Sequence, residues 1–327
     1  MSTIRFGYTL SSEEHPPNAL VENALRAEAA GFDFVSISDH FHPWTRAQGH
    51  SPFVWTVLGA LAQATYRIRV GVGVTCPILR IHPVVLAQAT ATTSLMFGDR
   101  FFWGVGTGEA LNEHVIGRRW PPPEVRLEML EEAVDVIRAL WSGETVDHRG
   151  QYFEVENAHL FDAPSAPIPL IVSGFGEGAA RLAGRIGDGY WGTAPDRELL
   201  DTYAAAGGRG PRYAQLRLCW ADDVERAQRT VRDIWPNAGL DGQLSQDLPT
   251  WTHFEQATSP LTVDQVTAQT PCGPDIASEV ARVVDEYRAA GYDHLYFHQV
   301  GHDQEGFFEF WERDLGPLLN GVTSSRH

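Results

Sequence analysis

Short apolar runs alternate with segments of helical periodicity along almost the whole chain. The first two runs, residues 4–10 and 33–40, read as strands, and the runs of this chain are near-continuous, as strands of a buried parallel sheet are. Between them, residues 18–32 place apolar side chains at helical spacing and reach a glycine near their end. The pattern therefore predicts parallel strands that are joined by helices.

Eight such units are predicted. The strands are expected at residues 4–10, 33–40, 68–77, 100–109, 168–175, 188–194, 214–221 and 293–301. The helices are expected at 18–32, 52–65, 82–97, 125–143, 176–187, 198–208, 224–235, 277–291 and 307–319. Right-handed crossovers allow a closed (β/α)8 TIM barrel or an open doubly wound sheet, and eight units favour the barrel. We expect a single domain over residues 1–327. Residues 151–167 are expected to be a polar excursion, and 236–272 an insertion after the seventh strand.

Composition narrows the class of protein. The chain has 327 residues, of which 43% are hydrophobic and 20% charged, which is typical of a globular protein. No apolar run reaches the roughly 20 residues of a membrane span. The N-terminus lacks the pattern of a secretion signal. Three widely spaced cysteines argue against a disulfide framework, so we expect a cytoplasmic protein.

Charge excludes several functions. The net charge is −17, which makes nucleic acid an improbable partner because nucleic-acid binding needs a basic surface. The chain contains no lysine, which excludes Schiff-base chemistry and a P-loop lysine. An anionic ligand must therefore be bound by arginine, by backbone amides or by the N-terminus of a helix.

The residues capable of chemistry follow the predicted strands, and in a TIM barrel the carboxyl ends of the strands form the active site. They are Glu13, Glu14 and His15 after the first strand, Asp39 and His40 after the second, Cys76 after the third, Glu109, Asn112 and Glu113 after the fourth, and His298, His302 and Asp303 after the eighth. We therefore expect them to meet at one mouth of the barrel.

Each of these features also has a purely structural interpretation. His40 alone would be a hydrogen-bonded structural histidine, but beside Asp39 and near Glu109 it is a candidate acid/base. The run GVGTGE fits a tight turn as well as a cofactor contact, and its glycines do not match a dinucleotide fingerprint. The run GFGEGAA offers free amides at the start of a helix and suits a phosphate. His298 and His302 lack further ligands at metal-binding spacing, so we expect no metal.

Five segments carry a resemblance to a known family: VSISDHFHPW, TCPILRIHPVVLAQ, GVGTGEALNE, LAGRIGDGYW and YFHQVGHDQEGFFEFWERDL. Together they resemble the bacterial luciferase-like superfamily, and within it the branch of coenzyme F420-dependent dehydrogenases of glucose 6-phosphate and of secondary alcohols. The resemblance extends from about residue 4 to residue 319 and weakens in the insertion. It implies a luciferase-like TIM barrel, coenzyme F420 as cofactor, a small-molecule substrate and a homodimer.

The resemblance also implies roles for individual residues. The implied catalytic residues are His40, Glu109, Trp44 and Glu13, with the choice between His40 and Glu109 as acceptor of the substrate proton left open. The implied cofactor contacts are Asp39, Val74, Cys76, Thr107, Gly108, Asn112, Gly176, Gly178 and Ala179, with a cis peptide at Gly73–Val74. The implied substrate contact is Thr193. Trp251 suits either the substrate lining or the core.

Departures from the family concern the substrate phosphate. Where the glucose-6-phosphate enzymes carry two lysines and an arginine, this chain has approximately Asp196, Ser245 and Gln269, and residues 236–281 contain no lysine or arginine. Arg197 is the one nearby replacement. Each lost charge-assisted bond removes about 1.5–3 kcal/mol. We therefore expect hydride transfer from an unphosphorylated sugar or secondary alcohol. The alternatives are a glucose-6-phosphate dehydrogenase proper, an FMN-dependent luciferase-like monooxygenase, and a non-catalytic cofactor-binding protein.

Overall fold

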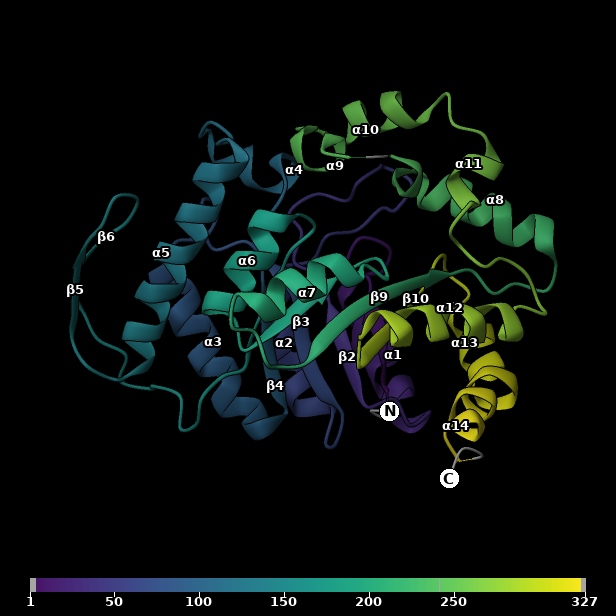
Figure 1. The fold of residues 1–327 in the computed structure, drawn as a ribbon, viewed down its shortest axis with the longest axis horizontal. Coiled ribbons are helices and arrows are strands. Elements are labelled where there is room, and N and C mark those ends of the chain that lie inside the picture. Colours follow the sequence, from purple (N-terminus) through teal and green to yellow (C-terminus); the bar gives the residue numbers. More distant parts are fainter. Residues whose placement is uncertain (1–3, 241, 325–327) are drawn as a thin grey trace.

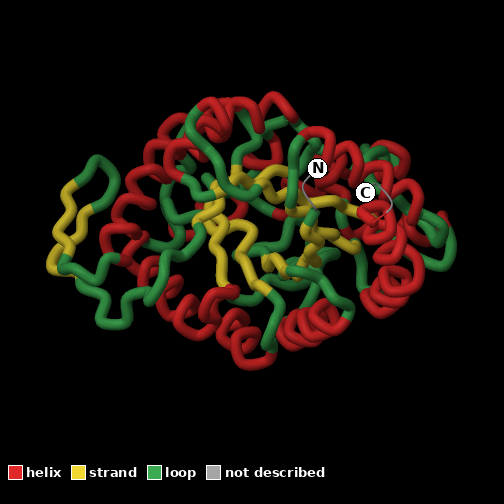
Figure 2. Tube along the Cα trace, turned by 60° about the horizontal axis from the view of Figure 1, so that its bottom comes forward, coloured by secondary structure: helices red, strands yellow, loops and turns green. Residues whose placement is uncertain are grey.

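The computed structural model describes residues 4–240 and 242–324. Its strands form a closed parallel barrel in which β10 pairs with β1 (Figure 2). Around the barrel the strands are β1 (Arg5–Leu10), β2 (Phe34–Ile37), β3 (Arg69–Thr75), β4 (Phe101–Val105), β7 (Leu170–Ser173), β8 (Gly189–Gly192), β9 (Arg212–Leu218) and β10 (His294–Gln299). The predicted barrel is confirmed, and each strand lies within its predicted segment or within two residues of it.

Helices surround the barrel and cover the outer faces of its strands (Figures 1 and 2). They are α1 (Pro17–Ala29), α2 (Val54–Ala64), α3 (Pro83–Phe97), α5 (Pro123–Trp141), α6 (Glu177–Ile186), α7 (Arg197–Ala205), α8 (Val224–Ile234) and α12 (Ala277–Ala290). The chain then forms α13 (Gln304–Phe310), a π-helical turn (Trp311–Leu315) and α14 (Gly316–Ser324). None of the helices that the structure describes is long and apolar enough to cross a membrane.

The inside of the barrel is filled by rings that form a cluster of their own. This cluster contains Phe34, Phe102, Ile171, Trp191, Tyr213 and Tyr296. Glycine is required beside these rings, because a Cβ at Gly71 would lie 2.2 Å from the Phe102 ring. Side chains alternate along a strand, so Arg217, four residues after the inward-facing Tyr213, also faces the inside, closer to the carboxyl end.

The polar excursion predicted at residues 151–167 is partly wrong. Part of it, with the residues before it, forms an antiparallel hairpin of β5 (Val146–Arg149) and β6 (Glu154–Ala158), which stands apart at the left of Figure 1. The Glu132 carboxylate of α5 accepts bonds from the backbone of Gln151, Tyr152 and Phe153 and so anchors the turn. Most side chains of β6 are exposed, so the hairpin lacks the apolar signal of a buried strand.

The insertion lies after the seventh barrel strand, as predicted, and forms short helices between α8 and α12. These are a 3-10 turn (Pro236–Gly239), α9 (Leu244–Asp247), α10 (Trp251–Thr258) and α11 (Val263–Thr267). Figure 1 shows them above the barrel, on the side away from the two termini. Trp235, Val266 and Val300 form a small apolar cluster against which Trp44 packs. The insertion therefore covers part of the carboxyl-end face.

Candidate active site

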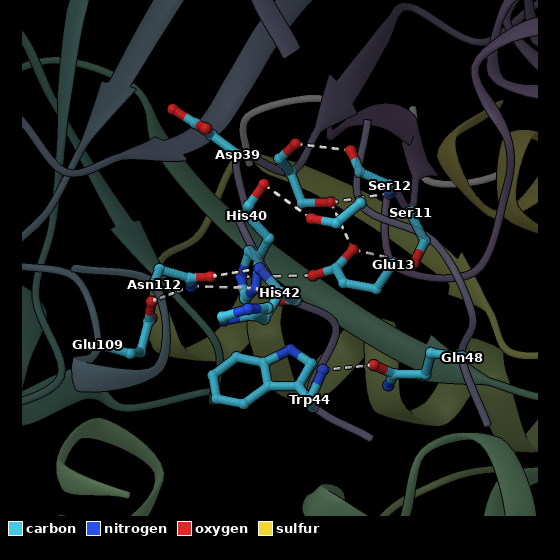
Figure 3. A network of polar contacts seen from close by, with 12 residues as sticks. Ser11, Ser12, Glu13, Asp39, His40, His42, Trp44, Gln48, Glu109 and Asn112 are labelled. Carbon is cyan, nitrogen blue, oxygen red and sulfur yellow. Dashed lines mark hydrogen bonds and ion pairs between the residues drawn. The ribbon is translucent and has the colours of Figure 1, made fainter. Parts of the chain in front are cut away.

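The loop after β2 carries the predicted acid/base. Figure 3 shows His40 turned toward Glu13 of the loop after β1, while Asp39 points away from this pair. His40 Nε2 lies 3.4 Å from Glu13 Oε1, and the two side chains are only 11% and 4% exposed. Little water reaches the pair, so its electrostatic interaction is weakly screened.

Hydroxyl groups hold Glu13 in place. Glu13 Oε2 accepts hydrogen bonds from Ser38 Oγ at 2.6 Å and from Ser11 Oγ at 3.2 Å. Ser12 binds the same loop, because its Oγ donates to the Ser38 carbonyl at 2.6 Å. The loops after β1 and β2 are thus tied together, and Glu13 faces His40 in a fixed position.

Asn112 holds the other side of His40. Its Oδ1 accepts from the backbone N–H groups of Phe41 and His42 at 2.9 and 3.2 Å, which fixes the turn that carries His40. Its Nδ2 lies 3.2 Å from Glu109 Oε2 and 3.1 Å from His40 Nδ1. The side chain therefore connects the imidazole to the second predicted acid, Glu109.

The surroundings of His40 Nδ1 suit both tautomers of the neutral imidazole. Nδ1 lies within hydrogen-bond distance of the Asn112 amide nitrogen, which donates, and of the His42 carbonyl at 3.2 Å, which accepts. These two bonds exclude each other, because one requires an unprotonated Nδ1 and the other an Nδ1–H. His40 therefore finds a partner whether Nδ1 carries a proton or not. Either ring nitrogen can therefore be the one that is free to accept a proton.

Aromatic rings cover this group from the insertion side. The Trp44 ring lies 5.0 Å from the His40 ring and 5.1 Å from Phe254 of α10. Its backbone N–H donates to Gln48 Oε1 at 2.7 Å. The Trp251 ring lies 5.2 Å from the ring of His42, which follows His40 by two residues. Trp44 is thus both a packing residue and the wall beside His40, whereas Trp251 contacts the loop and not His40 itself.

Asp39 belongs to a separate ion-pair group. Arg80 binds Asp39 Oδ1 at 2.8 Å and Glu113 Oε1 at 3.3 Å, and all three side chains are buried. Burial raises the pKa of Glu113 to about 7, although Arg80 works in the opposite direction. Asp39 Oδ2 is also buried and has no hydrogen-bond partner among the described residues. It therefore presents a free acceptor for a bound group.

The predicted cofactor contacts line the ends of neighbouring elements. Thr107 and Gly108 follow β4, and the peptide Gly73–Val74 in β3 is cis, as the family resemblance implied. Gly108 has φ +70, and a Cβ there would lie 2.5 Å from Cys76 Sγ. Burial raises the pKa of the Cys76 thiol well above its usual value, so Cys76 acts as a neutral packing group.

The start of α6 has the free backbone amides on which the predicted anion site depends. Gly176 is the N-cap residue and forms no side-chain cap, so the amides of the first turn lack intrahelical partners. No atom lies within 4 Å of the position that a Cβ of Gly176 would occupy. Gly178 and Ala179 follow in the first turn, where backbone N–H groups favour a phosphate.

The residues at the expected phosphate-binding positions after β8, Asp196 and the neighbouring Arg197, place no cation at the site. Asp196 caps α7 by accepting from Leu199 N at 3.0 Å, and Arg197 is exposed and donates to the Ala289 carbonyl. Thr193 is exposed just beyond β8, and its carbonyl accepts from the Tyr287 hydroxyl at 2.9 Å. No hydrogen bond or ion pair between the described residues links Thr193 to His40, so its contact with substrate stays a prediction.

A second buried group lies at the same mouth and was only partly foreseen. His298 Nε2 lies 2.6 Å from Glu14 Oε1, and Gly301 N–H donates to Glu14 Oε2 at 2.7 Å. Burial opposes ionisation of Glu14, but these two bonds outweigh it and lower its pKa. Among the described residues there is no group of three metal-ligating side chains, and His298 is held by Glu14.

Sequence reasoning missed two arginines at this mouth, Arg80 and Arg217. Arg217 faces the inside of the barrel on β9, next to His298 in the parallel register with β10. Its guanidinium lies 5.9 Å from the Trp235 ring. The alternation of β9 from Tyr213 onward was the available signal. Residues 236–281 of the insertion contain no lysine or arginine, but the barrel wall supplies the Arg217 cation.

The family is identified by comparison with known proteins. A family model described as luciferase-like monooxygenase matches residues 1–294. The chain belongs to this family. Among its luciferase-like relatives, the F420-dependent glucose-6-phosphate dehydrogenase of Segniliparus rotundus is 36% identical and covers 98% of this chain and 99% of its own. The enzyme of that name from Mycobacterium tuberculosis is 35% identical, with the same coverage.

A solved structure agrees with this placement. The luciferase-like chain superposes on an F420-dependent secondary alcohol dehydrogenase in complex with an F420–acetone adduct with a TM-score of 0.88. The two share 29% sequence identity, and the match covers 96% of this chain and 98% of that one. The barrel, the insertion and the order of elements are thus those of a luciferase-like enzyme over nearly the full length.

Proposed function

We propose that this protein is a dehydrogenase that takes a hydride from the carbinol carbon of an unphosphorylated sugar or a secondary alcohol. The chain is a coenzyme F420-dependent oxidoreductase, in keeping with its near full-length relatives and its structural neighbour. The observation that carries the dehydrogenase proposal is the His40 imidazole, which lies between the Glu13 carboxylate and the Asn112 amide.

The residues at the mouth fit the cofactor. The free, buried Asp39 Oδ2 is an acceptor for an N–H or O–H donor of the deazaflavin ring. The first-turn amides of α6, with the open approach at Gly176, suit the phosphate of the cofactor side chain. When bound, coenzyme F420 supplies a two-electron hydride acceptor at C5 of its ring. In the sequence, Thr107, Gly108 and Asn112 lie between Asp39 and Gly176.

His40 acts as the base in this proposal. In the tautomer whose Nδ1–H donates to the His42 carbonyl, Nε2 has a free lone pair and takes the proton of the substrate hydroxyl. The Glu13 carboxylate, whose Oε1 lies 3.4 Å from His40 Nε2, stabilises the positive charge of the resulting imidazolium in a poorly hydrated site. Trp44 packs against His40 and keeps water from that face. Glu109, connected through Asn112, is the second group able to accept a proton.

The substrate is assigned from charge. A dianionic phosphate needs cations, and residues 236–281 supply none, while Arg197 is directed to the Ala289 carbonyl. Arg217 is a single guanidinium on the barrel wall, in register with His298, which contacts Glu14. This supports an uncharged substrate and argues against glucose 6-phosphate. The glucose-6-phosphate relatives are the reason to include that compound in every assay.

The test is a spectroscopic assay with a matched histidine variant. Oxidised F420 is mixed with the enzyme and with free sugars, secondary alcohols and glucose 6-phosphate, and loss of the deazaflavin absorbance is followed. We expect His40→Ala to bind F420 with nearly unchanged affinity and to lose about 10²–10⁴-fold in turnover. His159→Ala, which changes an exposed histidine of the hairpin region, should match the wild type.

Two outcomes contradict the proposal. Full activity of His40→Ala would remove the assigned base. Faster turnover of glucose 6-phosphate than of the free sugar would overturn the substrate assignment. The second candidate, an FMN-dependent monooxygenase, is favoured by the description of the matching family. It would be indicated by oxygen consumption with reduced FMN when no alcohol bleaches F420.

A further inference from the structure

Arg217 and His298 face the inside of the barrel side by side. They are register partners on the adjacent parallel strands β9 and β10, so their side chains leave the sheet on the same face. The Trp235 ring contacts both, at 4.5 Å from the His298 ring and 5.9 Å from the Arg217 guanidinium. The two polar side chains therefore converge beneath one indole at the carboxyl-end mouth.

Both side chains have an unused hydrogen-bonding atom. Arg217 Nε and His298 Nδ1 are buried and have no partner among the described residues. His298 as a whole is 1% exposed, so water does not freely replace a missing partner. Buried polar atoms are nearly always satisfied in native structures. Two adjacent exceptions at the mouth of an enzyme barrel point to a ligand that supplies the missing bonds.

Glu14 decides the kind of ligand. It is ionised, because the bonds from His298 and Gly301 lower its pKa despite burial. His298 Nε2 lies 2.6 Å from Glu14 Oε1, and in the tautomer whose Nε2–H donates to this carboxylate, Nδ1 is an acceptor. Arg217 Nε–H is a donor. The two unpartnered atoms therefore offer one donor and one acceptor to a ligand.

A hydroxyl group is the complement of this pair, because one O–H accepts from Arg217 and donates to His298 at the same time. A carboxylate or phosphate oxygen has no proton for His298 Nδ1 and would add a negative charge beside Glu14. We propose that Arg217 and His298 bind a second hydroxyl of the substrate, so that the enzyme selects polyhydroxylated alcohols over simple secondary alcohols. This inference rests on the proposed dehydrogenase function and narrows its substrate class to polyols, including free sugars.

The β1 loop places this hydroxyl site beside the carbinol site. Glu13 holds His40 and its neighbour Glu14 holds His298, and the Cα atoms of adjacent residues lie about 3.8 Å apart. Trp44, beside His40, and Trp235, above Arg217, belong to one apolar cluster. One molecule with two hydroxyls can therefore reach both sites.

The experiment compares cyclohexanol with the positional isomers of cyclohexanediol and with free glucose, in wild type and Arg217→Met. In the wild type we expect kcat/KM for the best diol or glucose to exceed that for cyclohexanol by about 10²-fold or more, since the site would leave buried polar atoms unpaired with cyclohexanol. Arg217→Met should remove most of this ratio and change kcat/KM for cyclohexanol by about 3-fold or less. Arg212→Met is the matched control, because Arg212 lies at the other end of β9 and binds the Gly291 carbonyl.

Folding and binding are checked separately. His298→Phe removes the acceptor without touching Arg217, and it should reduce the diol preference in the same direction. Calorimetry with reduced F420 present measures diol binding without turnover, and Arg217→Met should weaken it about 10-fold or more while the affinity for F420 stays unchanged. A hydroxycyclohexanecarboxylate is included to detect an anion site.

The results separate the two proposals. Equal losses for cyclohexanol and the diols in Arg217→Met, or a wild type without diol preference, would overturn the hydroxyl site and leave the dehydrogenase function standing. Preference for the carboxylate over the diols would also overturn it. Diol binding that depends on Arg217 without any reduction of F420 would support the hydroxyl site and refute the dehydrogenase function.

Discussion

Glu113 gives the molecule a specific dependence of stability on pH. Burial raises the pKa of this carboxyl from 4.5 to about 7, while Arg80 and its N–H lower it only in part. An acid whose pKa is higher in the folded state binds more protons when folded. Its contribution to stability is therefore fully present below about pH 4.5 and is lost as the pH rises through 7.

The size of the effect follows from the two pKa values. Between pH 5 and pH 8, linkage with values of 4.5 and about 7 gives a loss of about 2.5 kcal/mol in the free energy of unfolding. Glu113→Gln is uncharged at every pH and lacks this loss. The amide also brings a donor close to Arg80 Nε, which bonds Glu113 Oε1 at 3.3 Å, but that penalty does not vary with pH.

Urea unfolding of wild type and Glu113→Gln at pH 5, 6, 7 and 8 measures the difference directly. We expect the variant to gain stability relative to wild type by about 2.5 kcal/mol over this range, with most of the gain below pH 7. Titrating groups that do not interact with Glu113 cancel in the difference. Two curves that run parallel from pH 5 to pH 8 would refute the reasoning. They would mean that Arg80 keeps Glu113 ionised throughout.

Two further substitutions test the site. Gly108→Ala places a Cβ 2.5 Å from Cys76 Sγ at φ +70 and should lower the free energy of unfolding by about 2–5 kcal/mol. The control Gly117→Ala has φ +78 but open space around the new Cβ, so it should lower the free energy of unfolding by only about 1–2 kcal/mol. Equal losses in the two variants would show that contact with Cys76 does not matter. Glu13→Gln removes the carboxylate that lies 3.4 Å from His40 Nε2. It should reduce kcat about 10–100-fold, which corresponds to the loss of a charge-assisted bond of about 1.5–3 kcal/mol, and leave the affinity for F420 unchanged. An unchanged kcat would remove Glu13 from the mechanism.

The barrel was predictable because its strands are apolar runs separated by helical segments. The β5–β6 hairpin was not, because its stability depends on Glu132, which lies outside the hairpin and receives its backbone bonds. A single carboxylate in a helix gives no signal of a hairpin anchor.

The homodimer that the family resemblance implies stays a prediction.

The candidate site also has a part that the sequence predicts and a part that only the folded chain reveals. Residues that share a motif, such as Asp39 and His40, were found from their place after a strand. The bond between Glu14 and His298 joins residues 284 positions apart and required the closed barrel to bring β1 beside β10. Asn112 was expected as a cofactor contact, but its bonds to Phe41 and His42 depend on turn geometry that spacing alone does not encode.

In the proposed substrate site, two adjacent glutamates hold the two histidines. The loop after β1 is a tight turn in which the N–H groups of Glu14 and His15 both donate to the Ser11 carbonyl. Glu13 is further fixed by Ser38, and Glu14 by Gly301. His40 and His298 are therefore held at a constant separation by one short segment of chain. A substrate whose two hydroxyls match that separation gains both sets of bonds, and a mismatch of about 1 Å loses catalysis as well as binding.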